Sequence, residues 1–323
     1  MRIQFVLTRF FSLLITFFLV MTAIFLLARA TGDPFAEIIE QDPRVPPEAV
    51  ERLRKRWGLD KPLHLQYLDF MKAMLSGDFG YSVAYYAPVF DVIMQKLPWT
   101  LFLLSTSIVL STVGAVLLGA YTAWRRGSRF DLTATNSALF VRAIPHFWLG
   151  MVLLLVFGFY LPIFPLYGAT TPGVDYPNTI EFLRDVLKHA ALPLTCLVLR
   201  QIGMYMLYMR SATLEVLGED FIVTAKAKGL SDREILFKHA VRNSLLPMVT
   251  ITALRFGFMV NGAILTETVF SYPGTGRLIY EAIMNSDYFL LQGAFFITAV
   301  CVLVANLIAD LLYAHLDPRV RVG

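Results

Sequence analysis

Three arginines stand inside long apolar stretches of the chain, where their side chains are well suited to binding an anionic solute. They are Arg142, Arg200 and Arg255. A charged side chain inside a membrane is costly, so it usually faces a cavity or a partner. A guanidinium group can direct two N–H donors onto one carboxylate. At a rise of about 1.5 Å per residue, the three arginines would lie near one level of a helical bundle. They therefore predict a path that binds carboxylates or backbone carbonyls.

A structural role for the arginines carries equal weight. They could pair with Glu267 or Asp310, with helix carbonyl groups, or with a second subunit. A further polar group, Asn261, Thr266 and Glu267, lies near the outer end of a later apolar segment. These three residues suggest gating of the path, or packing and capping of the turn SYPGTG at 271–276 that follows.

No sequence motif for covalent chemistry is present. The chain lacks the phosphate-binding pattern GxxxxGK[ST], the zinc pattern HExxH and the nucleophile pattern GxSxG. Its histidines are scattered, and Cys196 and Cys301 lie in apolar stretches without neighbours at metal-ligand spacing. We therefore expect a chain that is not an enzyme, with no catalytic residue, no metal site and no cofactor of its own.

The composition points to a membrane protein. Hydrophobic residues make up 57% of the chain and charged residues 16%. Soluble domains contain about 45–50% apolar and about 25% charged residues, so this excess exceeds what one globular core needs. The net charge of +4 and the pI of about 9.0 come from basic residues beside apolar segments, with no nucleic-acid-binding signature. We expect lipid and not nucleic acid as the surrounding partner.

Apolar segments long enough to cross a membrane position the arginines. A span needs roughly 20 residues, which predicts an all-α integral membrane protein with about six transmembrane helices. The first segment resembles a secretory signal, but its apolar run of about 18 residues exceeds the usual 7–15, so we expect a retained span. The predicted spans are 10–27, 99–124, 132–160, 190–209, 245–270 and 289–314.

Basic residues predict the orientation. The short loops at 125–129 and 226–242 are rich in Lys and Arg, and with six spans they share one side with Arg2, Arg9 and the tail at 319–321. Cytoplasmic loops carry such an excess, so both termini should be cytoplasmic. The first loop of the opposite side, 30–98, is too long for this rule.

The long loop has helical features of its own. One short helix should open at the prolines 46–47 and end at Gly58; Asp60 should cap a second, with Pro62 near its start and Gly77 after its end. One face of the second helix is apolar, and packing against the chain's own outer helices is favoured over contact with the membrane surface or a partner. This face contains Leu63, Tyr67, Phe70, Met71 and Met74.

The most informative segment follows the fourth span. Residues 219–228 form an amphipathic pattern that ends at Gly229, a suitable helix C-cap. Ser231 and Glu234 then form a capping box that starts a helix leading into the fifth span. A short helix held across the cytoplasmic face could fit a groove of another protein. The alternative is a basic loop held by anionic lipid headgroups.

This segment, EDFIVTAKAKGLSDREILFKHAVRNSLLP at 219–247, resembles the EAA loop of ABC importer permeases, and more narrowly that of the dipeptide and oligopeptide permease family. Further resemblances to that family, in order along the chain, are TGDP at 31–34, WGLDKPLHLQY at 57–67, GDFGYS at 77–82, IPHFWLG at 144–150, GAILTETVFSYPGTGRL at 262–278 and LDPRVR at 316–321.

The resemblance implies a type I ABC importer permease fold in a bacterial cytoplasmic (inner) membrane. It implies an N-terminal tail and first helix at 1–29, an external helical loop at 30–98, a five-helix core at 99–314 with a coupling loop at 212–245, and a cytoplasmic tail at 315–323. The residues expected to couple to an ATPase are Glu219, Asp220, Phe221, Thr224, Ala225, Lys226, Ala227, Lys228 and Gly229.

The resemblance also implies partners. They are a second, homologous permease, two cytoplasmic ABC ATPase subunits that bind ATP and Mg²⁺, and an external substrate-binding protein. Peptide is the expected cargo, with nickel, glutathione or an oligosaccharide as alternatives. A secondary transporter is a rival from another class, disfavoured by the docking segment and by the lack of a visible inverted repeat.

Overall fold

A computed structural model describes residues 3–30, 48, 51–52, 55, 58–259 and 263–316. Some sequence predictions lie outside these residues. They are the role of Asn261, the beginning of the first helix in the long loop, the motif at 31–34 and the basic tail at 319–321.

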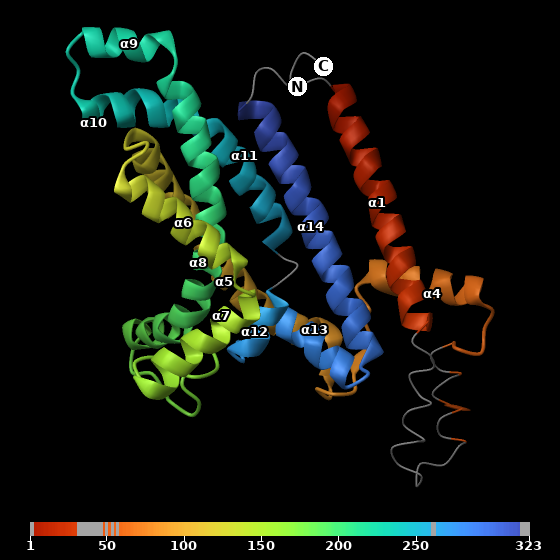
Figure 1. The fold of residues 1–323 in the computed structure, drawn as a ribbon. Helices are drawn as coiled ribbons and strands as arrows, with labels where there is room; N and C mark the ends of the chain where they lie inside the picture. Colours follow the sequence, from red (N-terminus) through yellow and green to blue (C-terminus); the bar gives the residue numbers. More distant parts are fainter. Residues whose placement is uncertain are drawn as a thin grey trace.

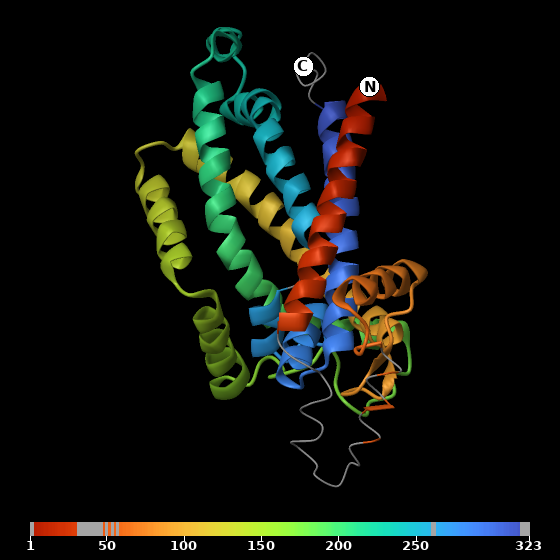
Figure 2. The ribbon, with the colours of Figure 1, turned by 90° about the vertical axis from the view of Figure 1, so that its right-hand side faces the viewer.

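Each of the predicted spans coincides with a helix or with a broken pair of helices. Long helices run side by side through the molecule, with α1 and α14 adjacent on one flank (Figures 1 and 2). The helices of the predicted spans are α1 (Ile3–Ala30), α5 (Val89–Trp124), α6 (Arg129–Ala143) with α7 (His146–Leu153), α8 (Thr179–Leu217), α11 (Arg242–Phe258) and α14 (Tyr288–Leu316).

Length and composition identify candidate membrane spans among the described residues. Helices α5 and α8 each satisfy both criteria alone, and α6 satisfies them when joined to α7 and the π-helical segment η1 (Leu154–Tyr160). Shorter apolar stretches lie within α1 at Phe11–Leu27 and within α14 at Tyr288–Val304. The fold is therefore an all-helical bundle suited to lipid.

Two helices begin earlier than the sequence suggested. Pro98 lies inside α5 rather than before it, and Pro193 lies inside α8 rather than in its first turn. Apolar length marks only the part of a helix that suits the membrane, whereas both helices extend into polar turns beyond it. A proline is tolerated within such helices because neighbouring helices and local adjustments compensate for the lost N–H.

The third predicted span, 132–160, is broken. Helix α6 ends at Ala143, α7 begins at His146, and the two are bent by 100°. Pro145 forces Ile144 out of the helical region, to φ −74° and ψ 130°. The fifth prediction, 245–270, is also wrong beyond Met259, because α11 ends at Phe258 and a separate short helix, α12 (Ile264–Val269), carries the rest.

The centre of the bundle is the contact between α5 and α8. A Cβ atom at Gly119 would lie 2.6 Å from the carbonyl oxygen of Met206, so only glycine allows the helices to approach this closely. Gly203 of α8 lies close to α6, where a Cβ would lie 3.0 Å from the Ala138 carbonyl oxygen. Helix α8 therefore packs closely against both α5 and α6.

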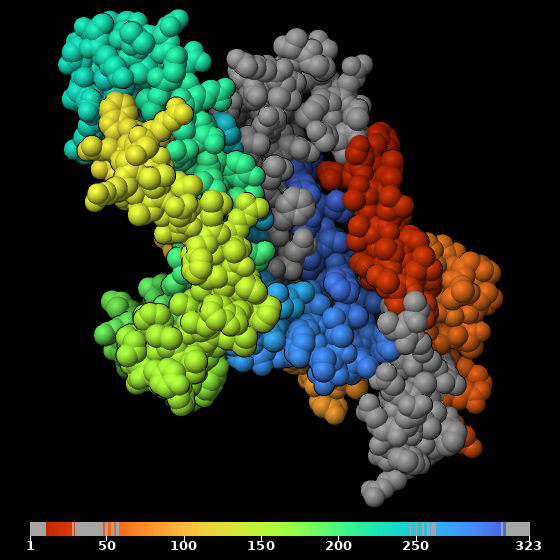
Figure 3. Space-filling model, in the orientation of Figure 1, coloured from red at the N-terminus to blue at the C-terminus, as the bar shows by residue number. Residues whose placement is uncertain are grey.

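The molecule has two unlike ends. The beginning of α1, the end of α14 and the short helices α9 (Asp220–Ala227) and α10 (Asp232–Glu234) lie at one end, here called the α9 end (Figure 1). Helices α4 (Leu63–Ser76), α12 and α13 (Thr275–Met284) lie toward the other, the α13 end. In the space-filling view, α6 and α7 form one flank and α1 and α4 the opposite flank (Figure 3).

The long loop packs against its own chain, as its apolar pattern favoured. Phe70, Met71 and Met74 of α4 are buried in a cluster with Met21 and Phe25 of α1. Two predicted details differ: Leu63 is 61% exposed, and Pro62 rather than Asp60 occupies the N-cap position. Gly77 ends α4 with φ +78°, as its type suggested.

A small hairpin completes the α13 end. Strands β1 (Tyr81–Ser82) and β2 (Ala87–Pro88) pair antiparallel, with Tyr81 opposite Pro88 and Ser82 opposite Ala87.

Candidate functional site

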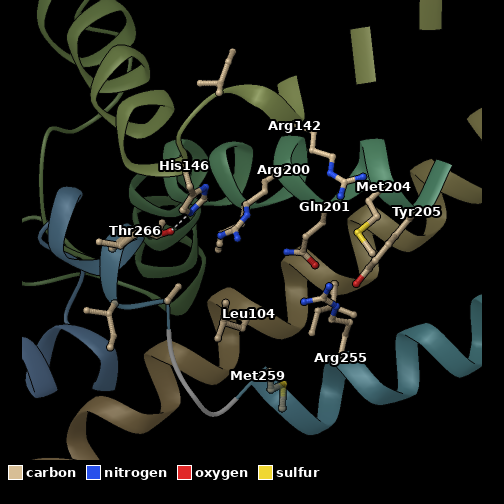
Figure 4. Close-up of a pocket in the computed structure, with 16 residues that line it drawn as sticks. Leu104, Arg142, His146, Arg200, Gln201, Met204, Tyr205, Arg255, Met259 and Thr266 are labelled. Atoms are coloured by element: carbon tan, nitrogen blue, oxygen red, sulfur yellow. Dashed lines mark hydrogen bonds between the residues drawn. The ribbon is translucent and has the colours of Figure 1, made fainter. Parts of the chain in front are cut away.

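A cavity of about 610 Å³ lies between the broken span and the helices opposite it (Figure 4). Arg142, in the last turn of α6, Arg200, within α8, and Arg255, in the last turn of α11, all line it. The structure thus brings together the three arginines that the sequence placed near one level. A solute path requires such residues to line one shared cavity, as these three arginines do.

The three guanidinium groups are available to a ligand in the isolated chain. Each arginine is exposed, and none has a hydrogen bond or ion pair with another described residue. No aspartate or glutamate occurs among the lining residues, so the described wall is cationic. The alternative partner Glu267 is bonded elsewhere, and the Asp310 side chain lies outside the described part of the chain.

The arginines divide between two parts of the cavity. Arg200 lies on the side of His146 (Figure 4), and His146 Nε2 is 2.6 Å from Thr266 Oγ1 of α12. Arg142 and Arg255 lie on the other side, beside Gln201 and Tyr205 (Figure 4). Tyr205 is one helical turn after Gln201 on α8, which runs toward the α9 end.

Close packing of α7 on α12 forms the wall at the His146 side. Cys196 Sγ of α8 lies 3.7 Å from His146 Nδ1, so three elements meet at this histidine. A Cβ at Gly150 would lie 3.3 Å from both Phe270 and Val269, so glycine lets α7 lie directly against the end of α12. Histidine at the break therefore joins the broken span to the α13 end.

Glu267 does not line the cavity. Its fully buried carboxylate accepts hydrogen bonds from Thr100 Oγ1 at 2.9 Å and from the Arg277 N–H at 3.0 Å. A Cβ at Gly274 would lie 2.4 Å from the Glu267 carboxyl carbon. The geometry fits the packing and capping of the 271–276 turn that the sequence left as an alternative, and gating by Glu267 stays a prediction.

Three polar lining residues were not predicted to line the path or gate it: His146, Gln201 and Tyr205. The signal was present as a helical stripe, because Arg200, Gln201, Met204 and Tyr205 recur at the spacing that puts residues on one face. His146, a lone histidine among apolar residues, is hydrogen-bonded to Thr266.

A second candidate site is the α9 segment. Gly229 adopts φ +73° after α9, and Ser231 and Glu234 form the predicted capping box. Hydrogen bonds from Lys238 and Ser231 lower the pKa of Glu234, which keeps the capping carboxylate ionised. The π-helical segment η2 (Ile235–Val241) then leads directly into α11, as predicted.

The α9 helix is held by one face and presents the other. Ile222 and Ala225 are buried in a cluster with Ile235 and Leu236 of η2. Ala225 therefore points inward, whereas the other predicted coupling residues are exposed: Glu219, Asp220, Phe221, Thr224, Lys226, Ala227, Lys228 and Gly229. Only Gly218 and Glu219 separate α9 from α8, the helix that carries Arg200 and Tyr205.

Comparisons with known proteins cover nearly the whole chain. Residues 115–322 match the family model for binding-protein-dependent transport system inner membrane components, and residues 2–104 match the N-terminal model of the same kind of component. The oligopeptide transport system permease protein AppB of Bacillus subtilis is 36% identical over 293 residues, covering 90% of each chain.

Two further relatives have similar names. The dipeptide transport system permease protein DppB of Escherichia coli K12 is 35% identical, covering 90% of each chain, and the di/tripeptide permease DppB of Pseudomonas aeruginosa is 34% identical, covering 99% of each. Among solved structures, an amino acid ABC transporter with histidines matches at 15% identity and a TM-score of 0.45, covering 70% of this chain and 94% of that one.

Proposed function

Because the chain belongs to the family of binding-protein-dependent transport system inner membrane components, we propose that it is the permease subunit of an ATP-driven importer of dipeptides and oligopeptides. The observation that carries the proposal is the similarity to peptide permeases over nine-tenths or more of each chain. A permease subunit is not an enzyme, and ATP hydrolysis belongs to a separate subunit.

The partners are a second, homologous permease, two cytoplasmic ATPase subunits that bind ATP and Mg²⁺, and an external substrate-binding protein. The exposed face of α9 supports the ATPase contact, because its inward face is already fixed by Ile222 and Ala225. The arginine wall supports a second permease, because Arg142, Arg200 and Arg255 have no partner among the described residues of this chain.

Helix α9 transmits the work of the ATPases. When the two ATPases close on ATP, α9 moves with them and carries α8 along, since only Gly218 and Glu219 separate these helices. The permease pair then switches between states that open the cavity to either side. The cavity is the substrate path, and its arginines meet the peptide.

The chain lies in the bacterial cytoplasmic membrane with both termini in the cytoplasm. The basic loops support this orientation, as does the position of both ends of the chain beside α9. Nickel, glutathione and oligosaccharides are the alternative cargoes, and uptake measurements distinguish among them.

The first experiment is co-purification and reconstitution. The chain should bring down two ATPases and a second permease from detergent-solubilised membranes, and proteoliposomes with the binding protein should take up labelled dipeptide only with ATP. Uptake without ATP by the chain alone would instead establish a secondary transporter. Uptake of nickel, glutathione or an oligosaccharide in place of peptide would change the proposed substrate and leave the assignment as an ATP-driven importer unchanged.

One substitution tests the α9 contact. Lys228→Glu should reduce both the ATPase that co-purifies and the ATP-dependent uptake by about tenfold or more, because it reverses a charge on the docking segment. Lys72→Glu makes the same change at an exposed position of α4, and both quantities should stay normal. Equal losses of co-purifying ATPase and of uptake in the two variants would show that α9 is not the ATPase contact.

A further inference from the structure

Tyr205 carries a polar atom that the rest of the described chain does not satisfy. Its side chain is 1% exposed, and its hydroxyl has no hydrogen-bond partner. A buried hydroxyl without a partner is costly, so native proteins rarely keep one without a reason. Tyr205 lines the cavity, which leaves a ligand or a water molecule in the cavity as the acceptor.

Two arginines without a partner among the described residues line the same part of the cavity as Tyr205. Arg142 and Arg255 enter the same part of the cavity from α6 and α11 (Figure 4). Both arginines stand in the last turn of their helices, where a cation is favourable beside the helix C-terminus. Neither, however, hydrogen-bonds a carbonyl group of the described chain, so helix capping does not occupy their donors.

We propose that Tyr205, Arg142 and Arg255 form a carboxylate-binding subsite for the C-terminal carboxylate of the transported peptide. This deepens the proposed function and rests on it. An oxygen of the carboxylate accepts a hydrogen bond from the Tyr205 hydroxyl, and the guanidinium groups of Arg142 and Arg255 bind both oxygens. One ligand group thus satisfies a hydroxyl and two guanidinium groups that otherwise have no partner.

The subsite is separate from Arg200. Tyr205 lies five residues further along α8 toward the α9 end, about 7 Å at 1.5 Å per residue. Arg200 faces His146 instead, so the peptide meets Arg200 on the His146 side and its carboxylate settles at Tyr205 nearer the α9 end.

The remaining lining explains how one anchor serves many peptides. Met204 and Met259 lie in the cavity wall. Methionine side chains are flexible and adapt to varied apolar shapes. A cavity of about 610 Å³ is within the usual range for small-molecule sites. The fixed carboxylate anchor and the adaptable wall together favour short peptides of varied sequence with a free C-terminus.

Equilibrium binding to the purified complex, without binding protein, tests the subsite. The probes are labelled Ala-Ala and its C-terminal amide, which has the same size and no carboxylate. The wild-type complex should prefer the free carboxylate by about tenfold, and Tyr205→Phe should abolish most of that preference because it removes only the hydroxyl. The matched control is Tyr208→Phe, an exposed tyrosine on the same helix that does not line the cavity.

Arg255→Gln is the second variant, and it tests the subsite if Tyr205→Phe does not assemble. It should lower binding of Ala-Ala far more than binding of the amide. An acidic residue of the partner permease is the competing acceptor, and then the wild type would bind both probes alike. That result, or an unchanged preference in assembled variants, overturns the subsite.

The two proposals fail in different ways. If wild-type proteoliposomes import peptide with ATP but the variants keep the carboxylate preference, only the subsite falls. If the wild type imports another solute and no peptide, the peptide proposal falls and the subsite falls with it.

Discussion

At the scale of single residues, Glu267 illustrates how a buried carboxylate can be structural. A charge out of water is tolerated only when hydrogen bonds satisfy it. Thr100 of α5 and the Arg277 N–H of α13 donate to its carboxylate, which therefore fastens α12 to both helices. The Thr100 hydroxyl also accepts a hydrogen bond from the Thr275 N–H at 2.8 Å, so the network continues into the first turn of α13.

Removing that carboxylate should destabilise the α13 end. Glu267→Ala leaves a buried hydroxyl and a backbone N–H without partners, a loss of about 3 kcal/mol, whereas Glu267→Gln keeps an acceptor oxygen and should cost less. Thermal unfolding in detergent measures both, with Glu215→Gln at an exposed position of α8 as control. If Glu267→Ala unfolds like the wild type but abolishes uptake, the gating role is right and the structural account is wrong.

At the scale of elements, one ion pair joins the broken span to the helix beside it. Asp131 at the start of α6 receives Arg210 Nε at 2.7 Å and Nη2 at 2.8 Å, with the Gly127 N–H as a further donor. Arg210 lies two turns before the end of α8, which leads into α9. This bidentate pair links α6 to α8. Helix α6 carries Arg142 to the cavity, and α8 carries Arg200 there and leads into the α9 segment.

We expect loss of this pair to loosen coupling rather than to stop ATP hydrolysis. Arg210→Lys keeps the charge and loses the bidentate hydrogen bonding to Asp131. A movement of α8 should therefore be transmitted less completely to α6. The ATP hydrolysed per peptide imported should rise several-fold in reconstituted complexes. Asp69→Asn, which breaks the exposed Lys61–Asp69 pair on α4, should leave the ratio unchanged, since such pairs contribute little. A normal ratio in Arg210→Lys would refute the connection.

The helices and their prolines show which features of the fold can be predicted from the sequence alone. Pro98, Pro145 and Pro193 all lie within or beside apolar runs, yet only Pro145 stands at a break. Apolar length is a local property, so the helices could be predicted. Whether a proline bends or breaks its helix depends on the neighbouring helices that compensate for the lost hydrogen bond, and one sequence does not contain that information.

The candidate sites also contain some residues that could be predicted from the sequence and others that could not. Counting 1.5 Å per residue was enough to bring Arg142, Arg200 and Arg255 to one cavity, and the capping box at Ser231 followed from a local pattern. Tyr205 could not be singled out, because its importance lies in a hydroxyl that packing leaves without a partner. Ala225 likewise needed the structure to show that it packs inward.

At the scale of the whole molecule, the two ends have different tasks. At the α13 end, Asp287 accepts hydrogen bonds from Ser82 Oγ at 2.6 Å and from the Ala84 N–H at 3.1 Å, which fixes the hairpin loop to the start of α14. At the α9 end, the short helices stand on the long ones and expose both polar and apolar side chains. The cavity lies between these two ends, and we expect the partner ATPases to act on the α9 end.

This polarity predicts which end faces the cytoplasm. In a background with both native cysteines replaced by serine, Val223→Cys on α9 and Tyr86→Cys on the hairpin loop offer exposed thiols at opposite ends, since the native side chains are 64% and 80% exposed. A membrane-impermeant maleimide should label Tyr86→Cys from outside the cell and Val223→Cys only in inverted vesicles, because the basic loops lie at the α9 end. The reverse pattern would place α9 where no cytoplasmic ATPase can reach it, and the importer assignment would fail at its first physical requirement.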